Sequence, residues 1–146
     1  MQARIHAAGD GRKLEVLGNT MIEKAGSADL SGGAAVLVMS VEPHLGPPAH
    51  VHDEADEFFF VLEGEIDVWV GERHAKLSAG MSATLPRGIG HRFDNLGARP
   101  AKVLLVVTPA AGAAFFDDLD RERPQLPREF DKVVRALERH DIRLAA

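Results

Sequence analysis

The amino-acid sequence predicts an all-β fold, a sandwich or closed barrel, followed by a C-terminal α-helical segment. Between residues 14 and 108, short apolar or alternating runs are separated by turns rich in glycine and proline, a pattern typical of many short strands. After Pro109 the apolar residues recur at helical spacing instead. A chain of 146 residues has the length expected of one domain.

Residues 1–30 are mixed and dotted with glycine, and they predict short strands and an arm. Strand-like pieces lie at residues 14–17 and 19–23, and the whole segment is too short and aperiodic for a helix-turn-helix domain. Residues 34–41 form a short apolar run that predicts a buried strand. The prolines within residues 43–48 end this run.

Residues 57–62 predict a strand that is almost wholly apolar after its first residue. Alternate side chains of a strand point to opposite faces, so Glu57, Phe59 and Val61 share one face. If Glu57 points into a barrel, Phe59 and Val61 line the interior. The opposite face then carries three large apolar side chains that need cover from elsewhere: Phe58, Phe60 and Leu62.

Further strands are expected at residues 66–70, 73–77, 91–95 and 103–108. Beyond them, residues 111–119 predict a short helix, which Pro124 and Pro127 interrupt. Residues 128–140 predict an amphipathic helix packed on the barrel or on a partner. Its apolar stripe consists of Phe130, Val133, Val134 and Leu137.

Composition excludes several classes of function. The 17 basic and 22 acidic residues give a net charge of −5 and are mixed along the chain, so nucleic-acid binding is not expected. The absence of cysteine excludes disulfides and thiolate ligands and fits a reducing cytosol. The N-terminus lacks the apolar stretch of a signal peptide, and no run approaches the ~20 apolar residues of a membrane span. We therefore expect a cytoplasmic protein that does not bind membranes.

Three histidines and one glutamate indicate a possible metal-binding site. His50 and His52 are two positions apart, so on an extended strand both side chains leave the same face, about 6.5–7 Å apart along the chain. Glu57 begins the next strand, and His91 follows a turn of proline and glycine. Imidazole and carboxylate together suit a divalent transition metal such as iron, manganese, nickel or cobalt, and less specifically zinc. The alternative is a polar cluster held only by hydrogen bonds.

The two segments that carry these residues resemble the two conserved motifs of the cupin family. Residues 80–95 match the second cupin motif at every fixed position. Residues 46–64 match the first motif except that three residues, rather than five, separate Gly46 from His50. This departure concerns the loop that enters the site and not the metal ligands.

The resemblance implies a cupin double-stranded β-helix, or jelly-roll barrel, that binds one divalent metal. The implied ligands are His50, His52, Glu57 and His91. Residues 31–109 would form the barrel core, residues 1–30 the N-terminal strands and arm, and residues 110–146 the C-terminal helical segment. Because a partner subunit often covers the outer face of such barrels, the resemblance also implies a homodimer.

The sequence indicates a role in substrate binding or local structure less strongly for several other side chains. The candidates for an apolar pocket above the metal are Met39, Phe59, Val61, Phe93 and Leu104, the alternative being plain barrel core. Arg87 lies near the expected mouth, where it either binds an anionic substrate or is a solvated turn residue. Asn95 is expected to satisfy local backbone groups.

Three functions remain open at this stage. The strand at residues 57–62 and the C-terminal helix resemble those of quercetin 2,3-dioxygenase-like cupins. This resemblance implies dioxygen and an enolic or aromatic small-molecule substrate, with Glu57 as the catalytic proton acceptor. A metal-assisted isomerase, decarboxylase or hydrolase is the second function, although the chain offers no tyrosine as an extra acid or base. The third is a non-enzymatic module that binds a small molecule.

Overall fold

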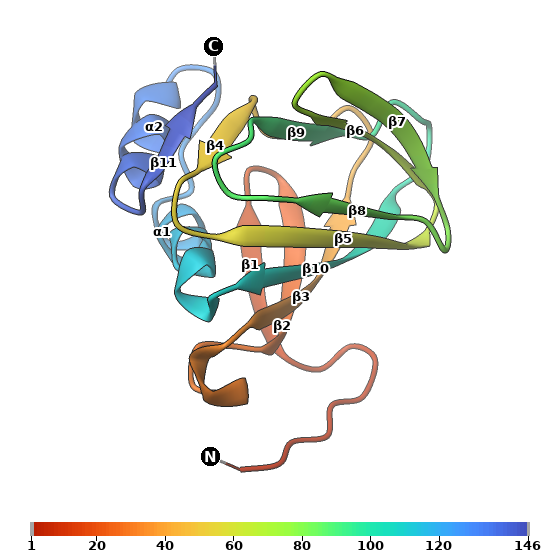
Figure 1. Cartoon of the computed structure of the whole chain (residues 1–146), viewed down its shortest axis with the longest axis vertical. Helices are drawn as coiled ribbons and strands as arrows, with labels where there is room; N and C mark the ends of the chain where they lie inside the picture. Colours follow the sequence, from red (N-terminus) through yellow and green to blue (C-terminus); the bar gives the residue numbers. More distant parts are fainter. Residues whose placement is uncertain (1, 146) are drawn as a thin grey trace.

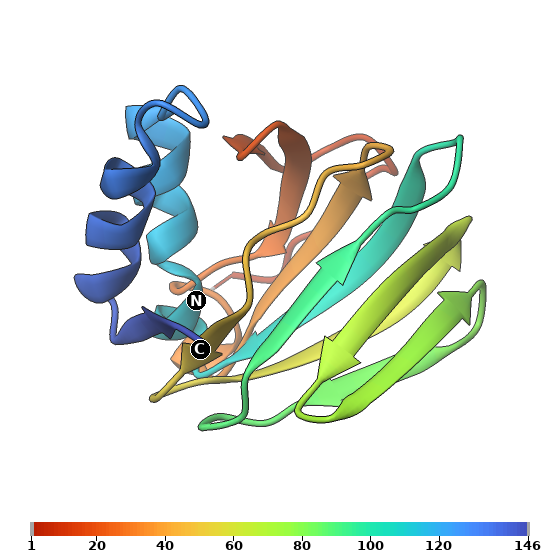
Figure 2. The same cartoon turned by 90° about the horizontal axis from the view of Figure 1, so that it is seen from above.

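Two antiparallel β-sheets face each other and form the barrel that the sequence predicts (Figures 1 and 2). The computed structural model describes residues 2–145. The larger sheet contains, in spatial order, β1 (Arg12–Val16), β2 (Asn19–Ala25), β3 (Ala35–Val41), β10 (Ala101–Thr108), β5 (Asp56–Glu63) and β8 (Ser82–Leu85). The smaller sheet contains β11 (Ile142–Leu144), β4 (His50–His52), β9 (His91–Asp94), β6 (Glu65–Val70) and β7 (Arg73–Ser78).

The inner face of the larger sheet forms much of the core. Along β10, side chains alternate between buried and more exposed positions, as expected for a strand with one face inside a barrel. Leu105 on this strand points inward and pairs with Leu37 on one side and Phe59 on the other. All three are almost fully buried. They form part of the hydrophobic core on the inner face of this sheet.

The outer face of the same sheet is also apolar. Val38, Leu104 and Phe60 are direct cross-strand neighbours on this face, and each is only partly buried. Phe58 is likewise half-buried, and Leu62 is exposed. Residues 2–145 of one chain therefore leave much of this face open to solvent. The homodimer that would cover it stays a prediction.

The N-terminal strands belong to the larger sheet. β1 and β2 form a hairpin through Leu17 and Gly18, both of which have positive φ, and β2 pairs with β3. The Cβ of a larger residue at position 18 would press against a side-chain carbon of Leu45, so glycine suits both the turn and the close approach. This hairpin extends the sheet along one side of the barrel.

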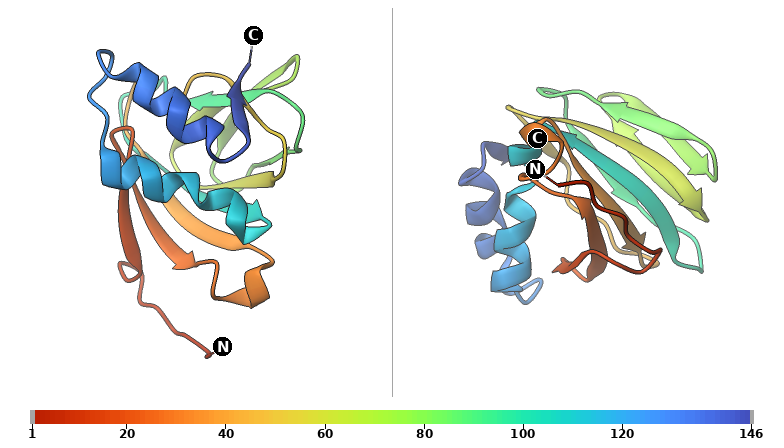
Figure 3. Two further views of the ribbon diagram at one scale, coloured as in Figure 1. Left: turned by 90° about the vertical axis from the view of Figure 1, so that its left-hand side faces the viewer. Right: turned by 90° about the horizontal axis from the view of Figure 1, so that it is seen from below.

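The C-terminal segment begins with η2 (Ala110–Ala113) and α1 (Phe115–Glu122) and continues with α2 (Phe130–Glu138). Both helices lie where the sequence predicts them, side by side against one side of the barrel (Figure 3). Asp118 on α1 joins them by ion pairs to Arg139 and His140, at 3.2 and 2.8 Å. Neither these helices nor any other within residues 2–145 has the length and apolarity needed to cross a membrane.

Short strands complete the sheets. β8 follows the turn at Gly80, while β11 follows α2 and pairs with β4. The sequence predicts neither β8 nor β11, since strands of three or four residues have too little pattern to recognise unless a motif marks them, as it does for β4 and β9. The register of β11 places Leu144 beside His50 and Ile142 beside His52. The C-terminal strand therefore supports the strand that carries two of the candidate metal ligands.

Candidate metal centre

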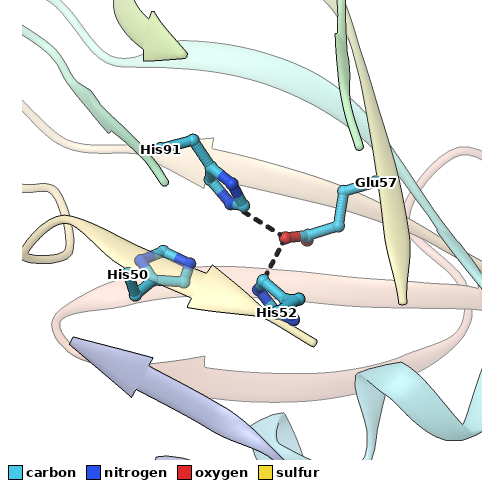
Figure 4. Close-up of side chains that lie close together, drawn as sticks. All are labelled: His50, His52, Glu57 and His91. Carbon is cyan, nitrogen blue, oxygen red and sulfur yellow. Dashed lines mark hydrogen bonds and ion pairs between the residues drawn. The ribbon is translucent and has the colours of Figure 1, made fainter. Parts of the chain in front are cut away.

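Four buried side chains converge inside the barrel (Figure 4). His50 and His52 project from β4, Glu57 from the start of β5, and His91 from the start of β9. One ligand atom of each residue lies within 4.8 Å of the ligand atoms of the others. These four residues form the histidine–glutamate cluster, and they are the four that the sequence nominates as metal ligands.

Glu57 lies at the centre of the cluster. Its Oε1 is 2.8 Å from Nε2 of His52 and 3.1 Å from Nε2 of His91. His50 approaches from the side, with its ring centroid 4.5 Å from that of His91. Its Nδ1 is 2.8 Å from the carbonyl oxygen of Pro48. Because a carbonyl oxygen can only accept a hydrogen bond, Nδ1 of His50 is the protonated nitrogen and donates to it. The Nε2 atom of His50 then carries a free lone pair.

The protonation states of the cluster suit a cation. Burial, with help from the nearby His91, lowers the pKa of His50 to about 4, so this imidazole is neutral at neutral pH. Burial alone would raise the pKa of Glu57, but its contacts with His52 and His91 outweigh that effect and hold its pKa well below the usual range. A neutral imidazole and an ionised carboxylate are the forms that bind metals.

The cluster also contains a polar atom that a metal would satisfy. Nε2 of His52 is buried and lies close to Glu57, yet it makes no properly directed hydrogen bond with any atom of residues 2–145. Buried polar atoms without such a partner are rare in proteins. A cation shared between this nitrogen and the carboxylate would satisfy both. The cluster could therefore hold one metal ion.

Loops from both motifs hold the ligands in place. A Cβ at Gly46 would overlap the carbonyl oxygen of Phe93, so only glycine lets the loop before β4 pack this closely on β9. The backbone N–H of Gly88 donates to the carbonyl of His52 at 2.8 Å. Asn95 donates from Nδ2 to the carbonyls of Val41 and Arg99, as the sequence predicts for a residue that satisfies the local backbone.

A small cavity of about 50 Å³ adjoins the cluster. Met39, Phe59 and Phe93 line it, in agreement with their nomination from the sequence. Two other nominated residues do not. Val61 is fully buried elsewhere in the core. The prediction for Leu104 is wrong, because this residue lies on the outer face of β10 and its neighbour Leu105 faces the cavity.

The contribution of the two helices to this cavity could not be predicted from the sequence. The cavity wall includes three residues of α1 and two of α2, namely Phe115, Phe116, Leu119, Val133 and Leu137. The apolar stripe of the second helix is visible in the sequence, but the stripe does not say which part of the barrel it covers. Asn19 and Met21 of β2 also line the cavity and carry no signal in the sequence.

Three cationic side chains that could have bound an anionic substrate lie outside the cavity. Arg87 is bound to Asp56 at the start of β5, with an N–O distance of 3.1 Å, so the loop before β9 is tied to that strand. Arg92 has its guanidinium 3.5 Å above the ring of Trp69. Lys102 is 3.9 Å from Glu63 near the end of β5. None of the three lines the cavity beside the cluster.

Comparison with known proteins identifies the family. The sequence profile of the cupin domain matches residues 37–107, a span that contains all four residues of the histidine–glutamate cluster. The chain belongs to the cupin family. The fold and the two motifs of this cupin agree with that assignment.

Three proteins similar to this cupin bear on its fold and family. This cupin is 29% identical over 77 residues to the polyketide synthase protein CurC of Streptomyces cyaneus, a match that covers 53% of this chain and 50% of CurC. It thus spans about half the length of the curated relatives it matches. The polyketide cyclase RemF of Streptomyces resistomycificus is 21% identical, with a TM-score of 0.63 and coverage of 74% of this chain and 80% of RemF.

A sugar phosphate isomerase of the cupin superfamily from Silicibacter pomeroyi is 29% identical to this cupin, with a TM-score of 0.57. That match covers 72% of this chain and 69% of the isomerase. The names of these relatives describe different reactions. The comparisons therefore establish the family and the fold, and the reaction has to be argued from the site.

Proposed function

We propose that this cupin is a metal-dependent, dioxygenase-like oxidoreductase that acts on a small aromatic or enolic substrate. One observation carries the proposal: the buried histidine–glutamate cluster adjoins a cavity whose other lining side chains are almost all apolar. This combination suits a substrate that binds through one oxygen and is otherwise hydrophobic.

Four protein ligands leave one or two positions open on iron, manganese, nickel or cobalt, or on zinc. A metal held there supplies Lewis-acid activation of a bound oxygen. The protein itself would supply the ligands that hold the ion and a wall that excludes water. His50, His52 and His91 would hold the ion from two strands, and the packed wall of the cavity would exclude water from the reacting atoms.

Glu57 is the proposed proton acceptor. It is the one carboxylate among the residues that line the cavity, and it is ionised. An enol or phenol placed at the cluster would give its hydroxyl proton to Glu57 and become the more reactive enolate. In the dioxygenase reaction both oxygen atoms then enter the product, so the reaction needs no external reductant.

The composition of the cavity favours this reaction over decarboxylation or isomerisation of an anionic substrate. Neither lysine nor arginine contributes to its wall, so a substrate carboxylate or phosphate would lack a cationic partner. Apart from the cluster itself, the wall also contains no acid or base that could return a proton on the opposite side of the substrate.

Cyclisation of a polyketide-type substrate is a second candidate, and the likeness to CurC favours it. Ring closure between two carbonyl groups also begins with removal of a proton from an enolisable position. Glu57 would accept that proton in the same way. The two candidates thus share the cluster, the proton acceptor and the enolisable substrate, and they differ in whether dioxygen is consumed.

A single experiment separates them. Protein loaded with iron, manganese, cobalt, nickel or zinc is incubated with flavonols and with linear polyketones while dioxygen uptake is recorded and products are weighed by mass spectrometry. We expect dioxygen consumption and incorporation of both oxygen atoms into the products. The control pair is Glu57→Gln, expected to be inactive, and Glu54→Gln in the exposed loop, expected to be active.

Other outcomes contradict the proposal in distinct ways. Loss of water from a polyketone without dioxygen uptake would favour the cyclase. Binding without any turnover would favour a small-molecule-binding module, and a protein that retains none of these metals would exclude both metal-dependent reactions.

A further inference from the structure

Among residues 2–145, Asn19 is the one polar side chain that lines the cavity outside the histidine–glutamate cluster. It stands at the first position of β2 and is only 4% exposed. The other lining residues are aliphatic, aromatic, methionine, proline or glycine. A single amide in such a wall is well placed to orient a ligand, because apolar pockets gain specificity from a few positioned polar groups.

The orientation of the Asn19 amide is fixed by the backbone. Its Oδ1 accepts a hydrogen bond from the N–H of Glu42 at 3.0 Å. Because an N–H group cannot accept, the oxygen must be at this end of the amide and Nδ2 at the other. Within residues 2–145, Nδ2 of Asn19 donates no hydrogen bond to a protein atom. A residue of the cavity wall thus has an amide donor that makes no hydrogen bond within the described part of the chain.

We propose that Nδ2 of Asn19 donates a hydrogen bond to a second oxygen of the substrate, away from the oxygen at the histidine–glutamate cluster. The inference rests on the proposed function, since it assumes that one substrate oxygen binds at the cluster. The substrate would then carry two oxygen functions joined by an apolar chain or ring. Asn19 would select such compounds over analogues that lack the distal oxygen.

Two seven-carbon ketones test the inference directly. 2,4-Heptanedione offers one enolisable diketone for the cluster, and 2,4,6-heptanetrione adds a third carbonyl without lengthening the chain. Binding of both to nickel-loaded protein is measured by calorimetry, with metal content checked afterwards. For wild type we expect the trione to bind about three- to tenfold more tightly than the dione, the gain expected from one neutral hydrogen bond.

The matched variant is Asn19→Asp. Its carboxylate can still accept from the N–H of Glu42, so it keeps this contact while a carboxylate oxygen replaces the amide donor. We expect retained nickel and loss of the preference for the trione. Asn19→Leu, which removes both groups, is the second variant and should lose the preference as well.

The outcomes distinguish this inference from the proposed function. If both ketones bind and Asn19→Asp keeps the full preference for the trione, Asn19 has a structural role only and the inference is wrong. If wild type binds both equally, the inference is again wrong, although the proposed function stands. If neither ketone binds to nickel-loaded wild type, the proposed function fails and the role of Asn19 fails with it.

Discussion

His50 and His91 are direct cross-strand partners, and through them β4 pairs with β9. Their ring centroids lie 4.5 Å apart. Since β4 comes from the first motif and β9 from the second, the pairing that joins the two motifs also assembles half of the histidine–glutamate cluster. The pairing of these two strands therefore places two of the four candidate metal ligands side by side, while Glu57 reaches them from the larger sheet.

Removal of an imidazole from this pair should abolish metal retention. We expect His91→Ala to bind nickel or iron more than about 100-fold more weakly than wild type, because even the loss of an outer partner of a ligand costs about 10–100-fold. Metal content after dialysis, measured by elemental analysis, checks this. His6→Ala, at an exposed position, is the control. Unchanged metal content in His50→Ala, His52→Ala and His91→Ala would contradict the assignment.

Metal should stabilise the fold as a whole. Free metal at 100 times its dissociation constant adds about 2.7 kcal/mol to the free energy of unfolding if the unfolded chain does not bind it. The melting temperature of metal-free protein should therefore rise on addition of the native metal. Glu57→Gln should show a much smaller rise, since it weakens the cation site. An equal rise in wild type and Glu57→Gln would show that the metal binds elsewhere.

The ion pairs of Asp118 between α1 and α2 should make the stability of the protein sensitive to acid. Its contact with His140, supported by Arg121 and Arg139, lowers its pKa to about 2. A carboxylate with a lowered pKa in the folded state stabilises the fold above its unfolded pKa, near 4, and loses this effect as the pH falls through about 2. We expect Asp118→Asn to reduce the unfolding free energy by about 1–2 kcal/mol at pH 7 and by little at pH 2.

Urea unfolding at both pH values checks the role of Asp118. Asp131→Asn is the control, because Asp131 pairs with Arg135 on the exposed surface of α2, where an ion pair contributes little. A loss in Asp118→Asn that is the same at pH 7 and pH 2 would rule out the charge as its cause.

Leu104 and Leu105 provide a test of strand orientation. Leu105 is 1% exposed and faces the core, so Leu105→Ala should cost about 2–5 kcal/mol of unfolding free energy. Leu104 lies on the outer face, and Leu104→Ala should cost about 1 kcal/mol or less when both variants are compared in a monomeric background such as Phe60→Glu. Comparable losses in the two variants would mean that the outer face is covered as tightly as the core.

The outer face of the larger sheet should form a homodimer. Phe60 lies in the middle of this face between Leu104 and Ser82. We expect wild type to sediment as a dimer and Phe60→Glu as a monomer. Phe130→Glu, which alters a partly exposed phenylalanine on α2, should leave the dimer intact. A monomeric wild type would refute the prediction.

The motif residues could be read from the sequence because their spacing corresponds to strand geometry. His50 and His52 share a face of any extended strand, and the turn before His91 is marked by Pro86 and Gly88. The face of Leu104 could not be read in the same way. It lies in an unbroken apolar run that has no alternation, and only the pairing of Leu105 with Phe59 shows which side is inside.

Asn19 shows a second limit of sequence reasoning. Its position at the start of a strand says nothing about a cavity, because its contact with Glu42 joins residues 23 positions apart. The helices α1 and α2 were predicted, but their place over the cavity depends on β11 returning to pair with β4. Such relationships arise from packing between distant segments and have no local signal.

Five of the side chains around the cavity belong to α1 and α2, and the space they leave has room for only a few water molecules. On the proposed function a flavonol or a polyketone is larger than this space, so the wall would have to open to admit it, and the two helices are the part of the wall whose shift would do so. Turnover should then carry the signature of a gated reaction, in which kcat falls as added glycerol slows the opening while the intrinsic rate of the chemical step is unchanged. The two helices would set the pace of the enzyme although neither carries a reacting group.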